Sequence, residues 1–380
     1  MKSIITITNR LDLEISRDDI KEIYKKSMGD GDFEVVIDEG RTFGHYITIE
    51  NEKIKKFVLL SSKTNESRNA YLSQFIFPAY SSFITDNTSK QKVFEVYLFP
   101  NNTVDANYNI FIFRLLKTLD IVIINESDFL KSEIPKFHNY KDIETFRNNN
   151  RDRNSNNNST YFSEEEDRIE VYAKVFGANG EESAFLCLIL KKVSRKPIWL
   201  YQVFDNDQKS LPHKILTILE SAGVEIKEEI SEVENPSIEL TKPEKDLRDT
   251  PKFHYNLLKK FNFKKCYLCA CDIGPIIIGS HIHRVADIKN DTSISVEEKI
   301  QQIVDGDNGL WLCASHDKLF ESGLVYFQDD KLKISNILTK IQITFVEDIT
   351  KNDTIESDYF NKKMKNYIDL HFKRTQSYSS

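Results

Sequence analysis

The chain has 380 residues, and its 52 Lys and Arg against 59 Asp and Glu give a formal net charge of −7. This length exceeds a single small module and predicts two or three domains of about 150 residues each. Hydrophobic residues make up 40%, with 12 Gly and 9 Pro, which excludes a wholly disordered, collagen-like or low-complexity chain. The acidic balance excludes a protein whose whole surface is basic, so any nucleic-acid site must be local.

The N-terminus and the apolar runs bear on the compartment. No apolar run of signal-peptide length precedes Arg10 and Asp12, and we expect a strand there rather than an export signal. The longest apolar stretch, 184–190, is far shorter than the roughly 20 residues that span a bilayer. We therefore expect a cytoplasmic protein without a membrane segment, in which closely spaced Cys residues bind metal rather than form disulfides.

Strand and helix patterns alternate along the N-terminal third of the chain. Runs of β-branched and aromatic residues predict strands at 4–7, 33–37, 45–49, 57–60, 93–99 and 121–124. Helices are expected at 17–28 and at 67–77, where Pro78 would stop the second one. These patterns predict a mixed α/β fold.

Two apolar runs, 169–176 and 184–191, flank the sequence GANGEES and predict a strand-loop-strand unit. A strand at 198–204 and a helix at 211–222 are expected to follow.

Two polar segments mark the organisation of the chain. Residues 145–163 are Asn-rich and predict an exposed loop, and residues 227–249 are Glu-rich with two Pro and predict a connector. We therefore divide the chain into a mixed α/β domain at 1–245, a second domain at 250–340, and a C-terminal helix and disordered tail at 341–380.

Four of the five Cys residues lie in one C-terminal stretch. Cys266 and Cys269 form a Cys-x2-Cys pair, and Cys313 and His316 form a Cys-x2-His pair. Two such pairs can direct four ligands to one tetrahedral centre, and a closed four-ligand centre is typical of structural zinc. The alternative is a set of small buried residues at accidental spacing. Cys271 is left outside the predicted ligand set.

The segment between the two pairs predicts a strand, an insertion, a strand and a helix. Residues 276–285 are rich in β-formers, and alternation along a strand would place His281 and His283 on one face. A capping-box pattern at Ser295 and Glu298 predicts a short helix to Val304. A turn, a second strand and a helix are then expected at 305–309, 310–313 and 316–323.

This arrangement resembles the HNH, or ββα-metal, nucleases, and in particular the HNH restriction endonucleases. Three motifs carry the resemblance: Gly279-Ser280-His281-Ile282, Asn308-Gly309-Leu310-Trp311-Leu312 and Asp317-Lys318-Leu319-Phe320-Glu321. It extends over about a fifth of the chain, residues 253–327. The resemblance implies an α+β chain with a C-terminal zinc-stapled ββα-metal domain and a preceding domain that recognises DNA.

The resemblance also implies roles for three residues. His281 would be the general base, because a neutral imidazole can take a proton from water near pH 7. Asp317 would hold Mg²⁺ or a similar divalent cation, and Asn308 would position the base. Many relatives have His where Asp317 stands, and Ser280 occupies a position that is often a second ligand. His283 could fill that gap or contact a phosphate, or it could be an ordinary surface His.

Contacts with DNA are expected beside this domain and in the N-terminal part. A local basic patch precedes the Cys pairs and could grip the phosphate backbone, or it could be a solvated helix end. The candidate backbone contacts are Lys259, Lys260, Lys264, Lys265, His283 and Arg284. Side chains of types that read base edges or contact phosphates occur at Arg68, Asn69, Gln74, Arg147, Arg151 and Arg153. Glu170 and Lys174 lack the spacing of the other large nuclease fold.

The sequence therefore predicts a type II, restriction-type endonuclease that cuts double-stranded DNA. Symmetric cleavage would need two active sites, so a homodimer is the expected assembly. A nuclease that cuts only methylated DNA is one alternative. A zinc-containing DNA-binding protein with an inactive HNH centre is the other.

Overall fold

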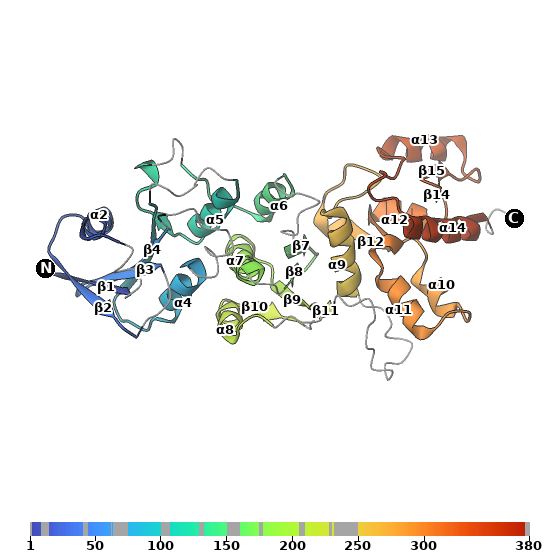
Figure 1. The fold of residues 1–380 in the computed structure, drawn as a ribbon. Helices are drawn as coiled ribbons and strands as arrows, with labels where there is room; N and C mark the ends of the chain where they lie inside the picture. The colour runs from blue at the N-terminus through green and yellow to red at the C-terminus, as the bar shows by residue number, and fades with distance from the viewer. Residues whose placement is uncertain are drawn as a thin grey trace. The chain divides into compact units, whose positions relative to one another are not determined.

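The computed structural model describes twelve parts of the chain, which are residues 2–8, 15–40, 45–61, 63, 75–99, 107–128, 133–149, 160–174, 178–204, 210–227, 230–231 and 250–376 (Figure 1). These form two compact units. The first comprises Met1–Thr160, Ala173–Gln202 and Gln208–Lys227, and the second comprises Tyr161–Tyr172, Val203–Asp207 and Glu228–Ser380. Several predicted features lie outside the described residues: Arg68, Asn69, Gln74, Arg151, Arg153, residues 67–74 of an expected helix, residues 150–159 of the expected loop, residues 228–229 and 232–249 of the connector, and residues 377–380.

A six-stranded sheet in the order β2-β1-β3-β4-β5-β6 forms the core of the first unit. Its strands are β1 (Ser3–Thr8), β2 (Phe33–Asp38), β3 (Tyr46–Glu50), β4 (Ile54–Leu60), β5 (Gln91–Tyr97) and β6 (Val122–Ile123). β3 runs antiparallel to both of its neighbours, whereas the remaining pairs are parallel. The six predicted strands are confirmed.

Several helices accompany the two sheets of the N-terminal part, which are α2 (Arg17–Met28), α4 (Phe77–Thr85), α5 (Asn107–Thr118), α6 (Tyr140–Asn149), α7 (Ala178–Val193) and α8 (His213–Ser221), with a 3₁₀ turn η2 (Glu126–Asp128). α2 has the predicted bounds, because Ser16 and Asp19 form a capping box at its start. The prediction that Pro78 ends a helix is wrong. α4 begins there instead, because Pro lacks only an N–H that the first turn does not use.

The second sheet has the order β10-β9-β8-β7, with β11 beside β9. Its strands are β7 (Thr160–Glu164), β8 (Ile169–Lys174), β9 (Ile198–Phe204), β10 (Val224–Ile226) and β11 (Ile230–Ser231). The predicted strand at 184–191 is wrong, since these residues belong to α7. Residues 184–190 of α7 are all buried, and a helix buried on every side gives the same unbroken apolar run as a central strand. The loop predicted at 145–163 is wrong at both ends, since 145–149 belong to α6 and 160–163 belong to β7.

The second unit follows the predicted order of elements. α9 (Thr250–Phe261) leads into η4 (Gly274–Ile276) and β12 (Ile277–His281), and the insertion contains α10 (Val285–Asn290) and α11 (Val296–Val304). The turn η5 (Gly306–Asn308), β13 (Gly309–Cys313) and α12 (Ala314–Glu321) come next. The chain continues through β14 (Val325–Gln328), β15 (Lys331–Ile334), α13 (Lys340–Ile349) and α14 (Lys362–Gln376).

Local sequence signals explain most of these bounds. Ser295 and Glu298 form the predicted capping box of α11. Gly323, at φ +70°, adopts the left-handed conformation that commonly follows a helix end. β12 ends at His281, so the expected alternation does not extend to His283. The division of the chain at 245 and 340 stays a prediction, although α13 and α14 belong to the same compact unit as β12.

Among the described residues, no helix combines the length and apolar character that a membrane crossing requires.

Candidate functional site

His281 ends β12, where it pairs with Gly309 of β13. Its Nε2 lies 2.8 Å from the carbonyl oxygen of Ile303. A carbonyl oxygen only accepts, so Nε2 carries the proton and the lone pair of the neutral ring lies on Nδ1. The ring also stacks on Phe253 of α9, with centroids 3.8 Å apart and planes 12° apart. Two contacts of different chemistry therefore fix the orientation of this imidazole.

The carbonyl of Ile303 is available because α11 ends one residue later. The last four carbonyls of an α-helix have no partner within the helix. At the end of α11, Ile303 accepts from His281 and Gln302 accepts from Asn308 Nδ2 at 2.9 Å. The C-terminal end of α11 thus accepts one hydrogen bond from His281 and one from Asn308.

Asn308 is fully buried and connects the strand pair with the insertion. Its Oδ1 accepts the backbone N–H of His283 at 2.7 Å, and its Nδ2 donates to the His283 carbonyl at 3.1 Å. Its own carbonyl accepts the N–H of Ile282 at 2.9 Å. Asn308 therefore fixes the two residues that follow His281. Gly309 is required next to it, because a Cβ there would lie 2.6 Å from Cζ of Phe253.

Asp317 lies in the first turn of α12 and is partly buried. α12 packs against both β12 and β13. Within the described part of the chain, Asp317 belongs to no group of three or more closely spaced His, Cys, Asp or Glu ligands. Ser280 is buried. The protein therefore offers one carboxylate here rather than a closed set of ligands.

Cys266, Cys269, Cys313 and His316 form one group whose ligand atoms lie within 4.8 Å of one another. The Sγ atoms of Cys269 and Cys313 are 3.9 Å apart. His316 Nδ1 lies 3.6 Å from Cys266 Sγ and 3.3 Å from Cys313 Sγ. A tetrahedral zinc centre requires S···S and S···N separations of about 3.8 Å and about 3.6 Å. The group fits such an ion, and Cys271 lies outside it.

The surroundings of this group also suit a metal. Burial raises the pKa of the Cys266 and Cys269 thiols and lowers the pKa of His316, so a bound cation would supply the charge that stabilises thiolates. The Thr350 hydroxyl donates to the Val346 carbonyl at 2.7 Å and lies 3.3 Å from His316 Nε2. The hydroxyl proton is thereby used, so His316 donates from Nε2 and keeps its Nδ1 lone pair for the metal.

His283 and Arg284 lie two and three residues beyond the end of β12. Burial lowers the pKa of His283, whose Nδ1 is buried without a hydrogen-bond partner among the described residues. Arg284 makes a two-point contact with Asp287, at 2.9 Å from Nε and 2.8 Å from Nη2. The structure therefore holds Arg284 in an ion pair on α10.

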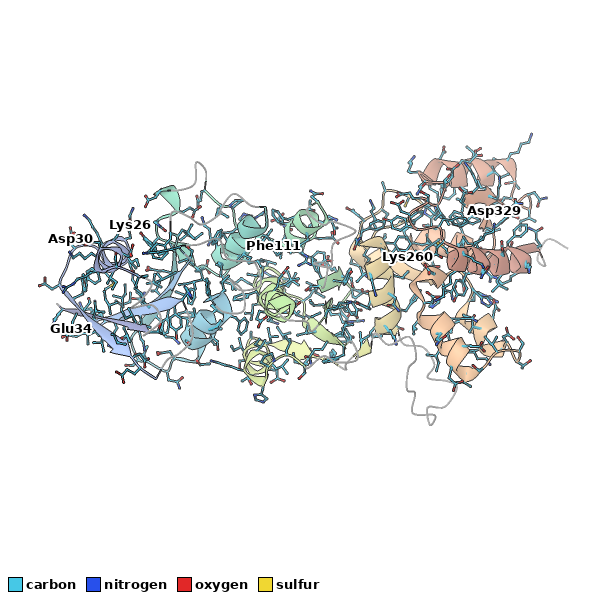
Figure 2. All side chains as sticks on the ribbon, viewed as in Figure 1. Lys26, Asp30, Glu34, Phe111, Lys260 and Asp329 are labelled. Carbon is cyan, nitrogen blue, oxygen red and sulfur yellow. The ribbon has the colours of Figure 1, made fainter. Side chains whose placement is uncertain are left out.

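The predicted basic patch divides into two exposed and two internal lysines. Lys259 and Lys265 are exposed. Lys260, labelled in Figure 2, donates to Asp307 at 2.7 Å. Lys264 is 5% exposed and donates to the Glu164 carbonyl at 3.0 Å and to Glu165 at 2.5 Å. The two internal lysines thus already have carboxylate partners.

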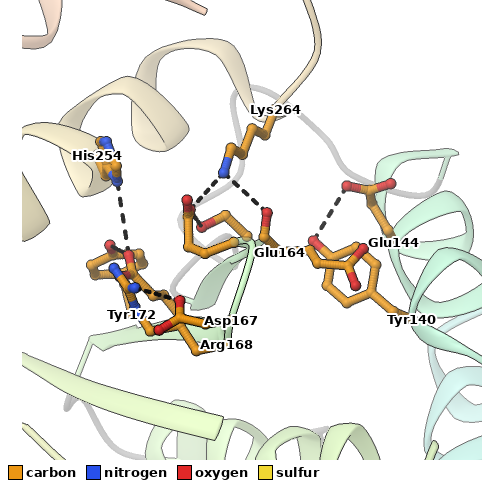
Figure 3. Close-up of polar contacts among 11 residues, drawn as sticks. Tyr140, Glu144, Glu164, Asp167, Arg168, Tyr172, His254 and Lys264 are labelled. Atoms are coloured by element: carbon orange, nitrogen blue, oxygen red, sulfur yellow. Dashed lines mark hydrogen bonds and ion pairs between the residues drawn. The ribbon is translucent and has the colours of Figure 1, made fainter. Parts of the chain in front are cut away.

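A second group of potential ligands, Glu165, Glu170 and His254, was not predicted as a site. Figure 3 shows Lys264 directed toward Glu164 at the end of β7, and His254 directed toward Tyr172 on β8. Arg168 contacts Glu170 at 2.6 Å, the Tyr172 hydroxyl donates to the same carboxylate, and His254 Nδ1 lies 3.8 Å from it. The one sequence signal was Glu170 itself, a charged residue within an apolar strand.

Comparison with known protein families identifies part of the second unit. Residues 266–328 match a family described as HNH endonuclease, and among curated proteins none matches the chain. This segment is therefore an HNH endonuclease domain, which confirms the resemblance to the HNH nucleases and indicates a nuclease that acts on DNA. Its position at the C-terminal end of a mixed α/β chain confirms the predicted fold class.

Proposed function

We propose that the protein is a metal-dependent DNA endonuclease of restriction type, in which the HNH domain hydrolyses the phosphodiester bond. The observation that carries the proposal is the hydrogen bond from His281 Nε2 to the Ile303 carbonyl, at 2.8 Å. This bond keeps the proton of the neutral ring on Nε2 and leaves the lone pair on Nδ1, which is the atom that a general base needs. The ring lies in a domain that matches a nuclease family.

His281 would take the proton from the attacking water at Nδ1. The Nε2–H bond to a backbone carbonyl stabilises the imidazolium that forms, because both ring nitrogens are then donors and the carbonyl remains an acceptor. The stack on Phe253 keeps the ring plane fixed during this transfer. The proton later leaves to solvent, and the leaving 3′ oxygen is protonated from water.

Asn308 would act as a positioning residue rather than as an acid or base. It is fully buried, its amide is used in three backbone contacts, and two of these are to His283. An amide that is occupied in this way holds the backbone that follows His281.

The two metals would have separate roles. Cys266, Cys269, Cys313 and His316 would hold zinc, which stabilises the domain and leaves no open position for chemistry. Asp317 would hold Mg²⁺ or a similar ion together with the DNA phosphate, since Mg²⁺ is commonly bound by one or two carboxylates plus substrate phosphates. A hard cation there would stabilise the negative charge that builds up on the phosphate.

The first 245 residues would recognise the DNA, and a homodimer would supply the two sites that a symmetric cut requires. Lys259 and Lys265, the two exposed lysines of the basic patch, would contact the backbone without sequence preference.

Digestion of unmodified and methylated duplex DNA with Mg²⁺ tests the proposal. A restriction enzyme gives fragments of unmodified DNA whose ends share one sequence. Fragments from methylated DNA alone would indicate a modification-dependent nuclease. DNA binding without cleavage of either substrate, by protein with its full zinc content, would contradict nuclease activity.

A further inference from the structure

α14 lies beyond the segment that matches the HNH family, yet it packs against the core of the second unit. Its buried side chains recur on one face of the helix, at Met364, Tyr367, Ile368, His371 and Thr375. This face contacts β14 and the turn η5, which ends in Asn308. Three of the buried residues, Tyr367, His371 and Thr375, carry polar groups and recur at every fourth position.

The N-terminal part of α14 holds the turn that precedes Asn308. The Tyr367 hydroxyl donates to Asp305 Oδ2 at 2.9 Å, and Lys363 Nζ contacts the same oxygen at 2.8 Å. Asn361, just before the helix, donates to Asp307 at 2.9 Å. Both carboxylates of the turn are therefore held by α14 or by the residue before it.

Asp305 is connected to Asn308 by hydrogen bonds within the turn. Its Oδ1 accepts the N–H of Asp307 at 2.9 Å, and its carbonyl accepts the N–H of Asn308 at 3.0 Å. Asn308 in turn bonds both backbone groups of His283 and the N–H of Ile282. A continuous chain of hydrogen bonds thus runs from Tyr367 to the residues that follow His281.

The C-terminal half of α14 holds α12, the helix that carries Asp317. His371 is 2% exposed, and its Nε2 donates to the Phe320 carbonyl at 3.1 Å. Its ring stacks on the Phe320 ring, with centroids 4.0 Å apart and planes 10° apart. Thr375 approaches Gly323 so closely that a Cβ on this glycine would lie 2.9 Å from Cγ2 of the threonine.

We propose that α14 is a positioning element of the nuclease site, in which Tyr367 sets the segment that fixes His281 and His371 sets the helix that carries Asp317. The proposal rests on the proposed function for the roles of His281 and Asp317. It makes residues far outside the family match, including the C-terminal helix, part of the working nuclease.

The protonation states suit this role. Burial and the nearby Asp305 carboxylate raise the pKa of Tyr367, so its hydroxyl remains a donor. Burial, together with the charge of Arg374, lowers the pKa of His371 to about 3. The neutral ring therefore keeps one N–H, which is used on Phe320.

Tyr367→Phe tests the first half of the proposal, because it removes the donor and keeps the ring. We expect kcat for DNA cleavage to fall about tenfold or more, with KM and zinc content unchanged, since small misplacements of catalytic groups are costly. Tyr326→Phe is the matched control. Tyr326 packs on Phe372 of the same helix, and kcat should stay at the wild-type value. Equal kcat for Tyr367→Phe and wild type would overturn the proposal.

His371→Phe tests the second half, because it keeps the stacked ring and removes the Nε2 donor. The expected change is an increase of several-fold in the Mg²⁺ concentration that gives half-maximal cleavage, while Tyr367→Phe leaves that concentration unchanged. An identical pattern in the two variants would mean that α14 only stabilises the fold.

Amide hydrogen exchange provides a readout that does not depend on activity. The N–H of His283 is bonded to Asn308 Oδ1, so its exchange should accelerate about tenfold in Tyr367→Phe and remain unchanged in Tyr326→Phe. Unchanged exchange at His283 would contradict the positioning role even if the protein cleaves no DNA. If exchange at His283 is faster in Tyr367→Phe but the wild-type protein cleaves no DNA, only the proposed function is rejected.

Discussion

Two groups of potential metal ligands lie in the same compact unit, and they differ in the charged side chains that surround them. The first group consists of Cys266, Cys269, Cys313 and His316. Burial raises the pKa of the Cys266 and Cys269 thiols, and a bound metal would lower it. The second, Glu165, Glu170 and His254, already contains protein cations, because Lys264 contacts Glu165 and Arg168 contacts Glu170. Ligand proximity alone does not define a metal site, since the charge that surrounds the ligands decides what can bind.

The comparison predicts the largest loss when a ligand of the thiol group is removed. Structural zinc contributes about 10–16 kcal/mol in small domains, so Cys266→Ser should leave the C-terminal unit unfolded and without zinc. Near-ultraviolet circular dichroism and metal analysis measure both. Cys271→Ser is the matched control, and it should keep zinc and fold because Cys271 lies outside the group. Full zinc content in Cys266→Ser would contradict the assignment.

A smaller effect is expected when the carboxylate group loses one of its own cations. Lys264→Met leaves Glu165 without its ion-pair partner, and breaking a buried pair costs about 3–5 kcal/mol. Urea unfolding measures this loss. Lys265→Met should change the free energy of unfolding by no more than about 0.5 kcal/mol, because Lys265 is exposed. Zinc content should stay unchanged in both variants, and its loss in Lys264→Met would show that the two groups are not independent.

The carboxylate group should also destabilise the protein in acid. Burial acts to raise the pKa of Glu170, but His254, Tyr172 and Arg168 outweigh it and lower the pKa from 4.5 to about 2. A depressed folded-state pKa stabilises the protein above pH 4.5 and loses this contribution as the pH falls toward 2. The loss amounts to about 3 kcal/mol.

Glu170→Gln should remove this part of the pH dependence. The free energy of unfolding, measured between pH 5 and pH 2, should therefore fall less steeply in the variant than in wild type. Identical slopes would mean that Glu170 does not titrate with the depressed pKa.

The smallest predicted effect concerns the residue behind the thiol group. Thr350→Val removes the hydroxyl that faces His316 Nε2, and loss of such a support commonly reduces metal affinity about tenfold. Competition with a chelator measures the affinity. Thr350→Ser keeps the hydroxyl and should retain wild-type affinity, so equal losses in both variants would assign the effect to packing.

The sequence predicted those features whose signals are local. The Cys-x2-Cys and Cys-x2-His pairs, the capping box at Ser295 and the turn and strand at Asn308 are encoded within a few residues, and the structure has them at the expected positions. Residues 184–191 of α7 resemble a strand in sequence because a fully buried helix has no polar face.

The features that were missed depend on distant contacts. The stack of Phe253 on His281, the pairing of Lys264 with Glu165 and the contact of Tyr367 with Asp305 each join residues from different elements. Lys264 is an example. Its neighbours in sequence indicate an exposed basic patch, whereas in the structure it is buried and its partner, Glu165, lies about a hundred residues earlier in the chain.

If His281 is the base of a DNA nuclease, its replacement must abolish cleavage, and the decisive measurement is the cleavage rate of His281→Ala. Wild type and variant are compared at equal zinc content, on the same duplex DNA with Mg²⁺. Loss of a general base predicts a fall of about 10²–10⁴-fold in kcat, with unchanged fold and zinc. Full activity in His281→Ala would contradict the account.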